Sequence, residues 1–414
     1  MPHFLDSVPF SGIIRIRDMM YAVDRPFRLD QGDLSFDAPD SVKQGMARAI
    51  AENRSHYLQT AGVPRLQELL AEKLRARNGI PVASPDEVMV TNGGIHALYI
   101  LFQALLDPGD EVIIPDPLWP PAAGTILSAR GQVVRYPLHE ATGWRLDVEE
   151  LAARITPRTR VIYVNSPQNP TGGVLTREDL EAIAALARTH GLWIVSDEAY
   201  EDVVYGVEHV SAASLAGMYP RTVPVYTFSK SYAMTGLRLG YLAVADRELR
   251  DRVRKALFFT TSNVSSIVQY GGIGALEGSQ ETVEAFRAEL QARRDLFYAG
   301  IESLGGLFAG CPPRGAFYAF LKFDPDWKAR VDPARLADAA ARRPAGTEAP
   351  SSPSWAITEF LISAARIGCV PGVDFGPGGE GYLRFCFARD RQELAGAVES
   401  MRQVFDRGPR PADD

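Results

Sequence analysis

The sequence predicts an α/β protein with two parts, a large domain built on a mostly parallel sheet and a smaller α+β domain. The first observation is length, because 414 residues exceed what one hydrophobic core normally holds. The second is the alternation of short β-rich stretches with helical stretches between residues 87 and 243. The third is a change of pattern after residue 280, where one long helix precedes shorter, scattered strands.

Six strands are predicted in the first part, each of them short and rich in β-branched or aromatic residues. They are Glu87–Val90, Glu111–Pro115, Arg160–Val164, Leu192–Asp197, Val223–Phe228 and Leu239–Ala243. Two connections between them have a clear helical pattern, His96–Leu106 and Arg177–His190, as parallel strands require. The run VIYV is apolar at every position, which is expected of a strand that helices cover on both faces.

The last third predicts the smaller domain. Glu281–Leu304 has the apolar spacing of one long amphipathic helix. Two shorter strands follow, Ala316–Lys322 and Tyr382–Phe387, and then a closing helix, Arg391–Phe405. Together they indicate an α+β arrangement.

The domain limits follow from the same patterns. The first 45 residues carry no strand of their own, so we expect them to join the small domain. The large domain is then predicted to span 46–295, and the small domain 1–45 together with 296–414. Within the latter, Arg343–Ser354 is rich in Pro, Ser, Ala and Gly and predicts a flexible surface loop, and the tail 408–414 is predicted to be disordered.

The composition limits the class of function. Apolar residues make up 46%, charged residues 23%, and the net charge is −7, which is typical of a globular protein and disfavours a nucleic-acid partner held by a basic face. No apolar run is long enough to predict a membrane span, and the N-terminus lacks the pattern of a signal peptide. The three cysteines, Cys311, Cys369 and Cys386, fit a reduced cytoplasmic protein. No histidine lies at metal-ligand spacing from another His or Cys, so no metal is predicted.

Small and hydrogen-bonding residues follow the predicted strands, at the edge where an α/β sheet presents its ligands. The segment Thr91–His96 contains two glycines and opens a helix, so its amides favour an anion such as phosphate, although a plain tight turn explains it as well. Its spacing is not that of a dinucleotide-binding loop. The rigid segment Asn165–Gly173 directs Asn169 toward the same edge.

Charged residues stand after the next two strands. Asp197 closes an apolar strand, where a carboxylate needs a cation, hydrogen bonds or a helix to cap. Lys230 and Arg238 follow the strand Val223–Phe228. A lone lysine is more often a surface residue, but two cations near an amide-lined turn indicate a ligand that bears a phosphate.

In this order and at these separations, the segments resemble the class I and II aminotransferases of pyridoxal-phosphate (PLP) fold type I, which are aspartate aminotransferase-like. The resemblance runs from about Ser11 to Phe405 and rests on LDQGDLSFDAP, HYLQTAGVPRLQELL, NSPQNPTGGV, VSDEAYEDVVY, TFSKSYAMTGLRLGY, PRGAFY and VPGVDFGPGGEGYLRF. It implies a seven-stranded sheet in a PLP-binding large domain. It also implies a transferase of amino acid metabolism, which moves an amino group between an L-amino acid and a 2-oxo acid.

The resemblance implies a role for individual residues. Lys230 would hold PLP as a Schiff base, Asp197 would pair with the pyridine nitrogen, and Tyr200 would bind the ring oxygen. The other implied cofactor contacts are Gly94, Ile95, His96, Trp119, Asn169, Thr227, Arg238 and, from a neighbouring subunit of a homodimer, Tyr57. The implied contacts to the substrate carboxylate are Gly32, Asn169 and Arg384.

Two departures and several alternatives stay open. The phosphate turn often carries a hydroxyl or amide side chain in this family, where this chain has Ile95 and His96. The stretch 324–355 is longer than the resemblance implies and is either a lid or an inert insertion.

The same residues also suit a PLP-dependent lyase, for example one that catalyses β-elimination, so the reaction has an alternative. A PLP-binding transcription regulator is disfavoured, because the first motif begins near residue 11 and leaves no room for a DNA-binding domain before it. An inactive relative is disfavoured because Lys230 is present. The side-chain pocket is expected near Ile13, Trp119 and Tyr57, and no second cation for an acidic donor can be placed there.

Overall fold

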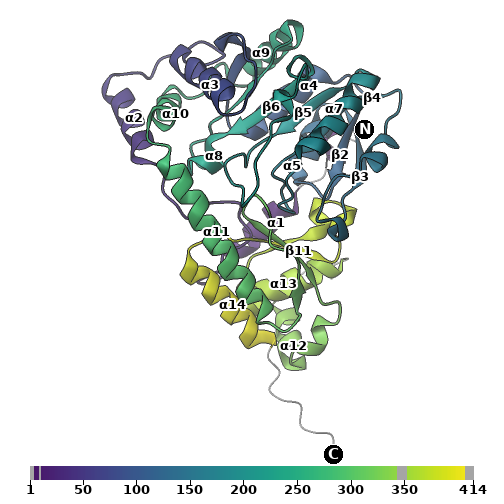
Figure 1. Cartoon of the computed structure of the whole chain (residues 1–414). Helices are drawn as coiled ribbons and strands as arrows, with labels where there is room; N and C mark the ends of the chain where they lie inside the picture. The colour runs from purple at the N-terminus through teal and green to yellow at the C-terminus, as the bar shows by residue number, and fades with distance from the viewer. Residues whose placement is uncertain (1–3, 9–10, 343–351, 406–414) are drawn as a thin grey trace, which may run out of the picture.

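The computed structural model describes residues 4–8, 11–342 and 352–405, which form two lobes, each built on one sheet. In Figure 1 the wider lobe holds the large sheet, and the long helix α11 (Glu281–Glu302) runs from it into the narrower lobe. The predicted α/β fold with a second, smaller α+β part is thereby confirmed.

The sheet of the wider lobe has seven strands in the order β1-β7-β6-β5-β4-β2-β3. Their bounds are β1 Val88–Thr91, β2 Glu111–Asp116, β3 Gln132–Pro137, β4 Thr159–Asn165, β5 Trp193–Asp197, β6 Thr222–Thr227 and β7 Gly240–Ala243. Strand β7 runs antiparallel to both of its neighbours, and the other pairs are parallel. All six predicted strands form. The seventh, β3, was not assigned to residues because it is a partly exposed edge strand without a continuous apolar run.

Helices cover both faces of this sheet, and the strands show this residue by residue. Val112 and Ile114 of β2 pack in one cluster with α4, α5 and α9, whereas Ile113 packs in another with α7. Such alternation is the period of a strand that is buried on both faces. The helices of the wider lobe are α2 Asp40–Ala51, α3 Pro64–Ala76, α4 Gly94–Leu105, α5 Pro120–Ser128, α6 Val148–Ala152, α7 Arg177–His190, α8 Phe228–Ser231, α9 Arg247–Thr261 and α10 Ser266–Glu277.

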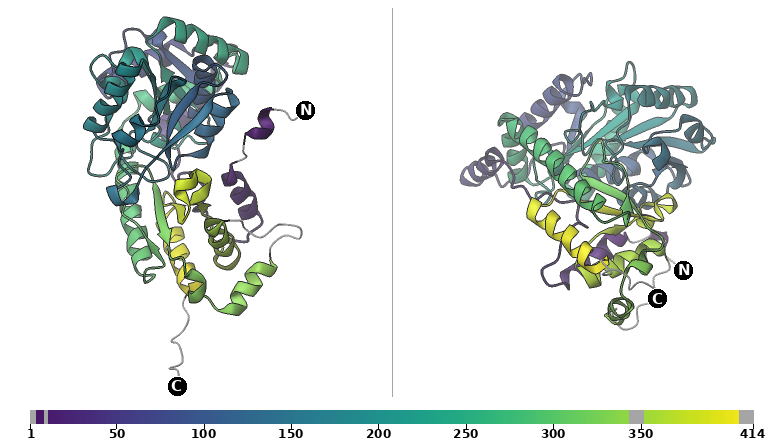
Figure 2. Two further views of the ribbon diagram at one scale, coloured as in Figure 1. Left: turned by 90° about the vertical axis from the view of Figure 1, so that its right-hand side faces the viewer. Right: turned by 60° about the horizontal axis from the view of Figure 1, so that its bottom comes forward.

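The narrower lobe is built on an antiparallel sheet in the order β10-β11-β9-β8. Its elements are α1 Gly12–Tyr21, β8 Phe308–Ala309, β9 Tyr318–Phe323, α12 Pro333–Ala341, α13 Pro353–Ala365, β10 Val370–Pro371, β11 Tyr382–Cys386 and α14 Arg391–Phe405. The views in Figure 2 agree that α1 lies against this lobe, where Ile16 and Met20 pack on Ile362 of α13.

The predicted domain limits fall inside continuous helices. Residue 46 lies within α2, which packs against α10 of the wider lobe, and a Cβ at Gly45 would lie 2.5 Å from the carbonyl oxygen of Tyr270. Residue 295 lies within α11. The limits 46–295, with 1–45 and 296–414, therefore stay a prediction.

Residues 324–342 of the stretch 324–355 lie away from the junction of the lobes. In Figure 1 α12 lies at the far end of the narrower lobe, and Trp327 packs against Phe360 and Phe405. Residues 324–342 are therefore no lid, whereas at the other end of the stretch Trp355 donates to Asp374 over 3.2 Å, next to Phe375. Residues 343–351 of the predicted loop and the predicted tail lie outside the described residues.

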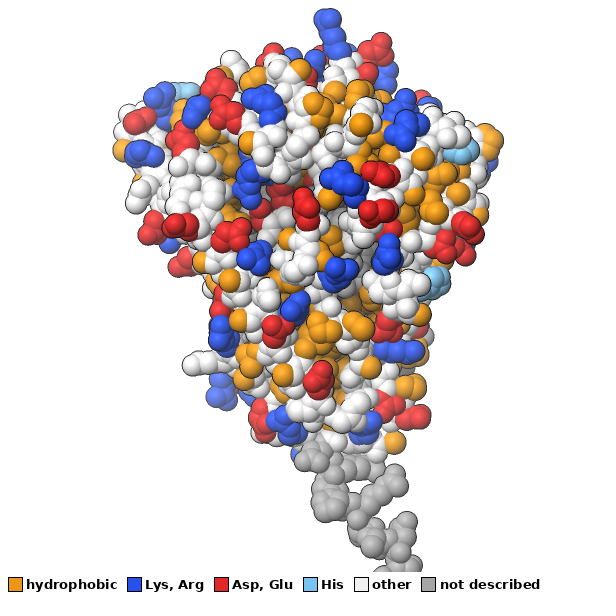
Figure 3. All heavy atoms as spheres, viewed as in Figure 1, with side chains coloured by type: hydrophobic (Ala, Val, Ile, Leu, Met, Phe, Trp, Pro, Cys, Tyr) orange, Lys and Arg blue, Asp and Glu red, His pale blue; other side chains and the backbone are white. Residues whose placement is uncertain are grey.

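Short 3-10 helices connect the other elements: η1 Phe4–Ser7, η2 Pro85–Glu87, η3 Glu140–Thr142, η4 Ala212–Ser214, η5 Tyr219–Arg221, η6 Trp327–Arg330, η7 Gly372–Phe375 and η8 Pro377–Gly379. Within the described ranges, no helix combines the length and apolar character that a membrane span requires, and no group of three His, Cys, Asp or Glu side chains could hold a metal ion. On the face shown in Figure 3, basic and acidic side chains are interspersed.

Candidate active site

The site lies at the carboxyl ends of β4, β5 and β6, where the wider lobe meets the narrower one. These strands are parallel neighbours, so the residues that follow them lie at one edge of the sheet. Asn169 follows β4, Asp197 ends β5, and Lys230 lies in α8 directly after β6. The narrower lobe adds Arg384 from β11, whose Nη1 donates to Oδ1 of Asn169 over 3.1 Å. The structure thus brings together the central residues that the sequence predicts.

Asp197 is a buried carboxylate with few partners. Its side chain accepts from the hydroxyl of Tyr163 at 2.7 Å and from the backbone N–H of Ala199 at 3.2 Å, and both donors are neutral. Burial raises its pKa to about 6, against the lowering effect of these hydrogen bonds. A cation placed against this carboxylate would remove the cost of burying its charge.

Lys230 is half-buried near Asp197, at the same edge of the sheet. Its Nζ donates to the carbonyl oxygen of Gly32 over 2.5 Å and lies 5.7 Å from the ring centre of Tyr200 and 5.3 Å from that of Phe317. Burial lowers the pKa of this amine to about 8, and the nearby guanidinium groups of Arg384 and Arg238 act in the same direction. A lysine that gives up its proton this readily can act as a nucleophile and as a base.

Arg384 is a buried cation, and no carboxylate among the described residues forms an ion pair with it. Only 2% of its surface is exposed, Nη2 donates to the carbonyl oxygen of Asp30 over 2.7 Å, and Nε has no hydrogen-bond partner among the described residues. The guanidinium lies 4.4 Å from the ring centre of Tyr318 and 5.1 Å from that of Phe375. A buried guanidinium with neutral partners is suited to bind a carboxylate.

A cup for an anion lies at the N-terminus of α4. Gly93 has a φ of 81°, and a Cβ there would lie 2.4 Å from Nη2 of Arg238, so the guanidinium lies directly against the glycine turn. A Cβ at Gly240 would lie 2.8 Å from the backbone nitrogen of Gly94, so β7 also approaches this turn closely. The hydroxyl of Thr227 caps α8, and the Cβ of this residue lies next to the same turn. Amides, a hydroxyl and a guanidinium of this kind fit a phosphate group.

Other predicted residues join the site or lie outside it. Tyr200 is buried and its hydroxyl lies 2.8 Å from that of Tyr318, and the backbone N–H of Trp119 donates to the carbonyl oxygen of Asn169 over 3.0 Å. Ile95 is partly exposed on α4. Tyr57 is 90% exposed, so it contacts none of these residues within one chain.

The side chain of His96 is directed away from the anion cup. Its Nδ1 accepts from the backbone N–H of Asn92 at 3.1 Å, and its Nε2 lies 2.9 Å from the hydroxyl of Thr260 in α9. Burial lowers the pKa of this imidazole. Any contact of His96 with a phosphate is therefore expected from its backbone at the start of α4.

Two tyrosines of the site were not predicted. Tyr163, within β4, donates to Asp197, and Tyr318, at the start of β9, contacts both Tyr200 and Arg384. A single hydroxyl inside the apolar run VIYV was the available signal for Tyr163, because a buried hydroxyl needs a partner. For Tyr318 the signal was its place in the segment PRGAFY.

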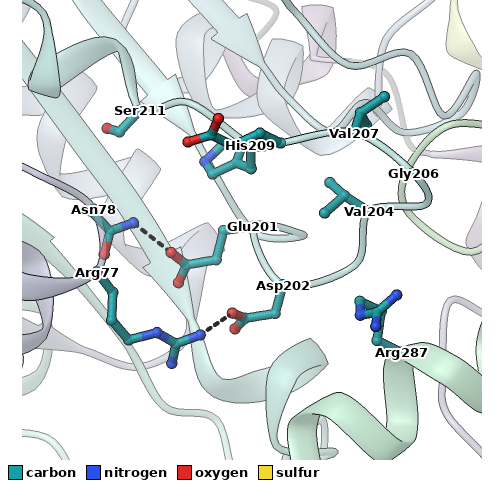
Figure 4. Close-up of a pocket in the computed structure, with 11 residues that line it drawn as sticks. Arg77, Asn78, Glu201, Asp202, Val204, Gly206, Val207, His209, Ser211 and Arg287 are labelled. Atoms are coloured by element: carbon teal, nitrogen blue, oxygen red, sulfur yellow. Dashed lines mark hydrogen bonds and ion pairs between the residues drawn. The ribbon is translucent and has the colours of Figure 1, made fainter.

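A cavity of about 630 Å³ lies elsewhere, and none of the predicted site residues lines it. Figure 4 shows that polar and charged side chains line its walls, and two hydrogen bonds join them: Arg77 to Asp202 at 2.6 Å, and Asn78 to Glu201 at 2.7 Å. These hydrogen bonds attach the segment after Tyr200 to the residues that follow α3, and the cavity is separate from the candidate active site.

Comparison with known proteins agrees with this geometry. Residues 25–401 match the family described as aminotransferase class I and II. An aromatic-amino-acid aminotransferase 2 of Thermococcus litoralis is 34% identical over 404 residues, which is 97% of each chain. An aspartate/prephenate aminotransferase of Thermus thermophilus is 37% identical over 382 residues, 92% of this chain and 91% of the relative. The chain therefore belongs to the class I and II aminotransferases.

Solved structures match over nearly the whole chain. An aromatic aminotransferase from Pyrococcus horikoshii has a TM-score of 0.81 at 34% identity and covers 94% of this chain and 98% of its own. The aspartate aminotransferase from Thermus thermophilus with maleate has a TM-score of 0.83 at 33% identity and covers 98% of this chain and 99% of its own. The expected fold and the expected transferase class are thus confirmed.

Proposed function

We propose that this aminotransferase depends on PLP, with Lys230 as the lysine that binds it, and moves an amino group from an L-amino acid to a 2-oxo acid. One observation carries the proposal. Asp197 and Arg384 are buried and Lys230 is half-buried where the two lobes meet, and the hydrogen-bond partners described above are neutral for all three. Buried charged groups of this kind are stabilised by ligands of opposite charge, and a nucleophilic amine reacts with an electrophile. A pyridine nitrogen, an aldehyde and a substrate carboxylate supply them.

The donor set fits PLP at each end. The turn at Gly94, with Thr227 and Arg238, would hold the phosphate, and Asp197 would hold the pyridine nitrogen. Tyr200 would bind the ring oxygen, Asn169 would lie on the same side, and Trp119 would cover the ring face. When bound, PLP supplies an electron sink for the substrate carbon that loses its proton.

The residues of the chain have separate tasks in this reaction. Arg384 orients the substrate through two parallel hydrogen bonds to its carboxylate, with Asn169 beside it. The carbonyl oxygen of Gly32 holds Nζ of Lys230 in the cleft. With a pKa near 8, that amine can take a proton at Nζ and return it, which is the work of a general base and acid. The aromatic rings around Arg384 keep water away from the carboxylate contact.

A homodimer is part of the proposal, because Tyr57 belongs to a site only through a second chain. Its side chain is 90% exposed, and Phe259 on α9 is 82% exposed. Large exposed apolar side chains of this kind are typical of surfaces that a partner covers. We also place the enzyme in the cytoplasm, since its three cysteines are free.

The names of the relatives guide the choice of donors for the test. Purified protein with PLP should show an absorbance band near visible violet, and it should convert an aromatic donor or aspartate when 2-oxoglutarate is added. Release of ammonia and a 2-oxo acid from the amino acid alone would instead support the lyase alternative. Absence of both reactions over a broad donor panel would contradict the proposal.

Lys230→Ala is the variant that tests the assigned lysine. It should lose the covalent link to PLP and nearly all turnover, because the variant lacks the amine that is assigned to the Schiff base. Lys43→Ala is the matched control, since Lys43 is an exposed lysine on α2. This variant should keep both the covalent link to PLP and the turnover. Mass spectrometry after borohydride reduction locates the linked lysine. Wild-type turnover in Lys230→Ala would remove this assignment.

A further inference from the structure

Tyr318 contacts three separate parts of the site from the narrower lobe. Its hydroxyl lies 2.8 Å from the hydroxyl of Tyr200, and its ring centre lies 4.4 Å from the guanidinium of Arg384. A Cβ on Gly32 would lie 2.2 Å from the same hydroxyl oxygen. The side chain is 1% exposed. Any displacement of this ring therefore changes its contacts with Tyr200, Arg384 and Gly32.

The register of the small sheet sets this position. Tyr318 of β9 pairs with Cys386 of β11, so its side chain is diagonal to Arg384 on the same sheet face. This diagonal neighbour is within reach of an aromatic ring, and the cation lies over the ring face. The hydroxyl at the far end of the ring then reaches Tyr200 of the wider lobe.

The hydroxyl pair limits where the proton of Tyr200 can go. Each hydroxyl has one proton, so one tyrosine donates to the other in the 2.8 Å contact. If Tyr318 donates, the proton of Tyr200 stays free for a second acceptor. The nearest acceptor that the proposed function supplies is the ring oxygen of PLP.

We propose that Tyr318 is a positioning residue that joins the cofactor end and the carboxylate end of the site: its hydroxyl donates to Tyr200, and its ring supports Arg384. The same hydroxyl leaves space only for glycine at position 32, whose carbonyl oxygen holds Lys230. This inference rests on the proposed roles of Tyr200 and Arg384.

Tyr318→Phe removes only the hydroxyl. In the PLP-loaded enzyme it should shift the pH at which the visible absorbance band changes, because Tyr200 is then free to rotate away from the ring oxygen. It should lower kcat about threefold to tenfold, the size of one hydrogen bond, with KM within about twofold of wild type. An unchanged absorbance titration together with unchanged kcat would overturn the role assigned to the hydroxyl.

Tyr318→Leu also removes the ring. It should raise KM for the amino donor about fivefold or more beyond Tyr318→Phe, because Arg384 loses the aromatic face on which it lies. A KM equal to that of Tyr318→Phe would overturn the role assigned to the ring.

Tyr205→Phe is the matched control for both variants. The hydroxyl of Tyr205 donates to the carbonyl oxygen of Ala316 over 2.7 Å, so it also links the two lobes and is also buried. It touches none of the proposed site residues. Its removal should leave the absorbance titration and KM unchanged, and equal shifts in Tyr205→Phe and Tyr318→Phe would show that a general loosening of the lobes causes them.

The glycine contact gives a test that does not depend on activity. Gly32→Ala should lower the melting temperature of the wild-type background, because its methyl group would overlap the hydroxyl of Tyr318. In the Tyr318→Phe background the same change should cost clearly less, since the next atom of the ring lies 3.3 Å away. Equal losses in both backgrounds would overturn the contact. This result holds whether or not the wild-type enzyme transfers amino groups, so it is separate from a failure of the proposed function.

Discussion

A buried carboxylate lies on each side of the end of β5, and the two differ in how many hydrogen bonds they accept. Asp197 and Glu198 are neighbours in sequence, and they are 6% and 1% exposed. On the cleft side, Asp197 accepts from one hydroxyl and one backbone amide. On the other side, Glu198 accepts from Ser196, Ser211, Tyr226 and His209, at distances from 2.7 to 3.0 Å.

The pKa values of the two carboxyl groups move in opposite directions for this reason. Burial dominates at Asp197 and raises its pKa to about 6. Burial acts at Glu198 as well, but its hydrogen bonds, led by the one from His209, bring the pKa below its ordinary value. Two carboxyl groups that are both buried can therefore have pKa values shifted in opposite directions. A carboxylate with a full set of donors supports the fold, whereas one with too few donors is available to a ligand.

The largest expected effect is on turnover when Asp197 is made neutral. Asp197→Asn should lower kcat about a thousandfold, because a carboxylate about 4 Å from a pyridinium contributes about 4 kcal/mol at an effective dielectric constant near 20. Steady-state kinetics with PLP in excess measures the loss. Glu198→Gln is the comparison on the other side of the strand and should lower kcat less than tenfold. Equal losses in the two variants would erase the distinction between the two sides.

The sequence predicts the cleft side of this comparison better than the other side. Asp197 and Lys230 stand after apolar strands, and the ends of parallel strands meet at one edge, so their convergence follows from local patterns. Arg384 is far from these residues in the sequence, and its place in the site was predicted only from the family resemblance. Its burial against Tyr318 depends on the register of the small sheet, which no local pattern fixes.

The side behind β5 was not predicted at all. His209 and Ser211 lie in a loop without regular structure, and their direction toward Glu198 is a result of tertiary packing. The same limit explains His96, which lies in the correct segment but directs its ring to Thr260 of α9. A motif places a backbone, whereas the direction of a long side chain depends on helices that are far away in the sequence.

The next effect is on stability and belongs to Glu198. Glu198→Gln should lower the free energy of unfolding by about 3–5 kcal/mol, because it breaks a buried pair with His209 and leaves two or more donors poorly matched. Urea unfolding of the PLP-loaded enzyme measures it. Ser214→Ala is a suitable control, since its hydroxyl donates only to the backbone nearby at Ser211. A loss below about 1 kcal/mol would mean that the cluster is not a structural support.

In protein without cofactor, replacing Asp197 should raise the stability, whereas replacing Glu198 should lower it. Its folded pKa is about 6 and the ordinary value is 3.8, so its contribution to stability is greatest below pH 3.8 and is lost as the pH rises through 6. At pH 8 the ionised group then costs at most about 3 kcal/mol, at 1.36 kcal/mol for each unit of pKa. Asp197→Asn without PLP should therefore melt higher than wild type at pH 8, with a smaller difference at pH 5. A variant that is less stable at pH 8 would show that Asp197 already has its full set of partners.

The smallest expected effect concerns His209 and the pH. Burial lowers the pKa of this imidazole, but the hydrogen bond and the charge of Glu198 raise it more, so the net shift is upward. The stabilisation by its charge is therefore complete below the ordinary histidine pKa of about 6.5 and is lost as the pH rises through the folded value. Because an asparagine keeps a donor for Glu198 and removes only the charge, His209→Asn should remove about 1 kcal/mol at pH 6 and less at pH 9. Melting curves of wild type and variant at both pH values give this double difference. A loss that is the same at both pH values would mean that His209 donates to Glu198 as a neutral imidazole. The charge of His209 would then contribute nothing to the stability of this side of β5.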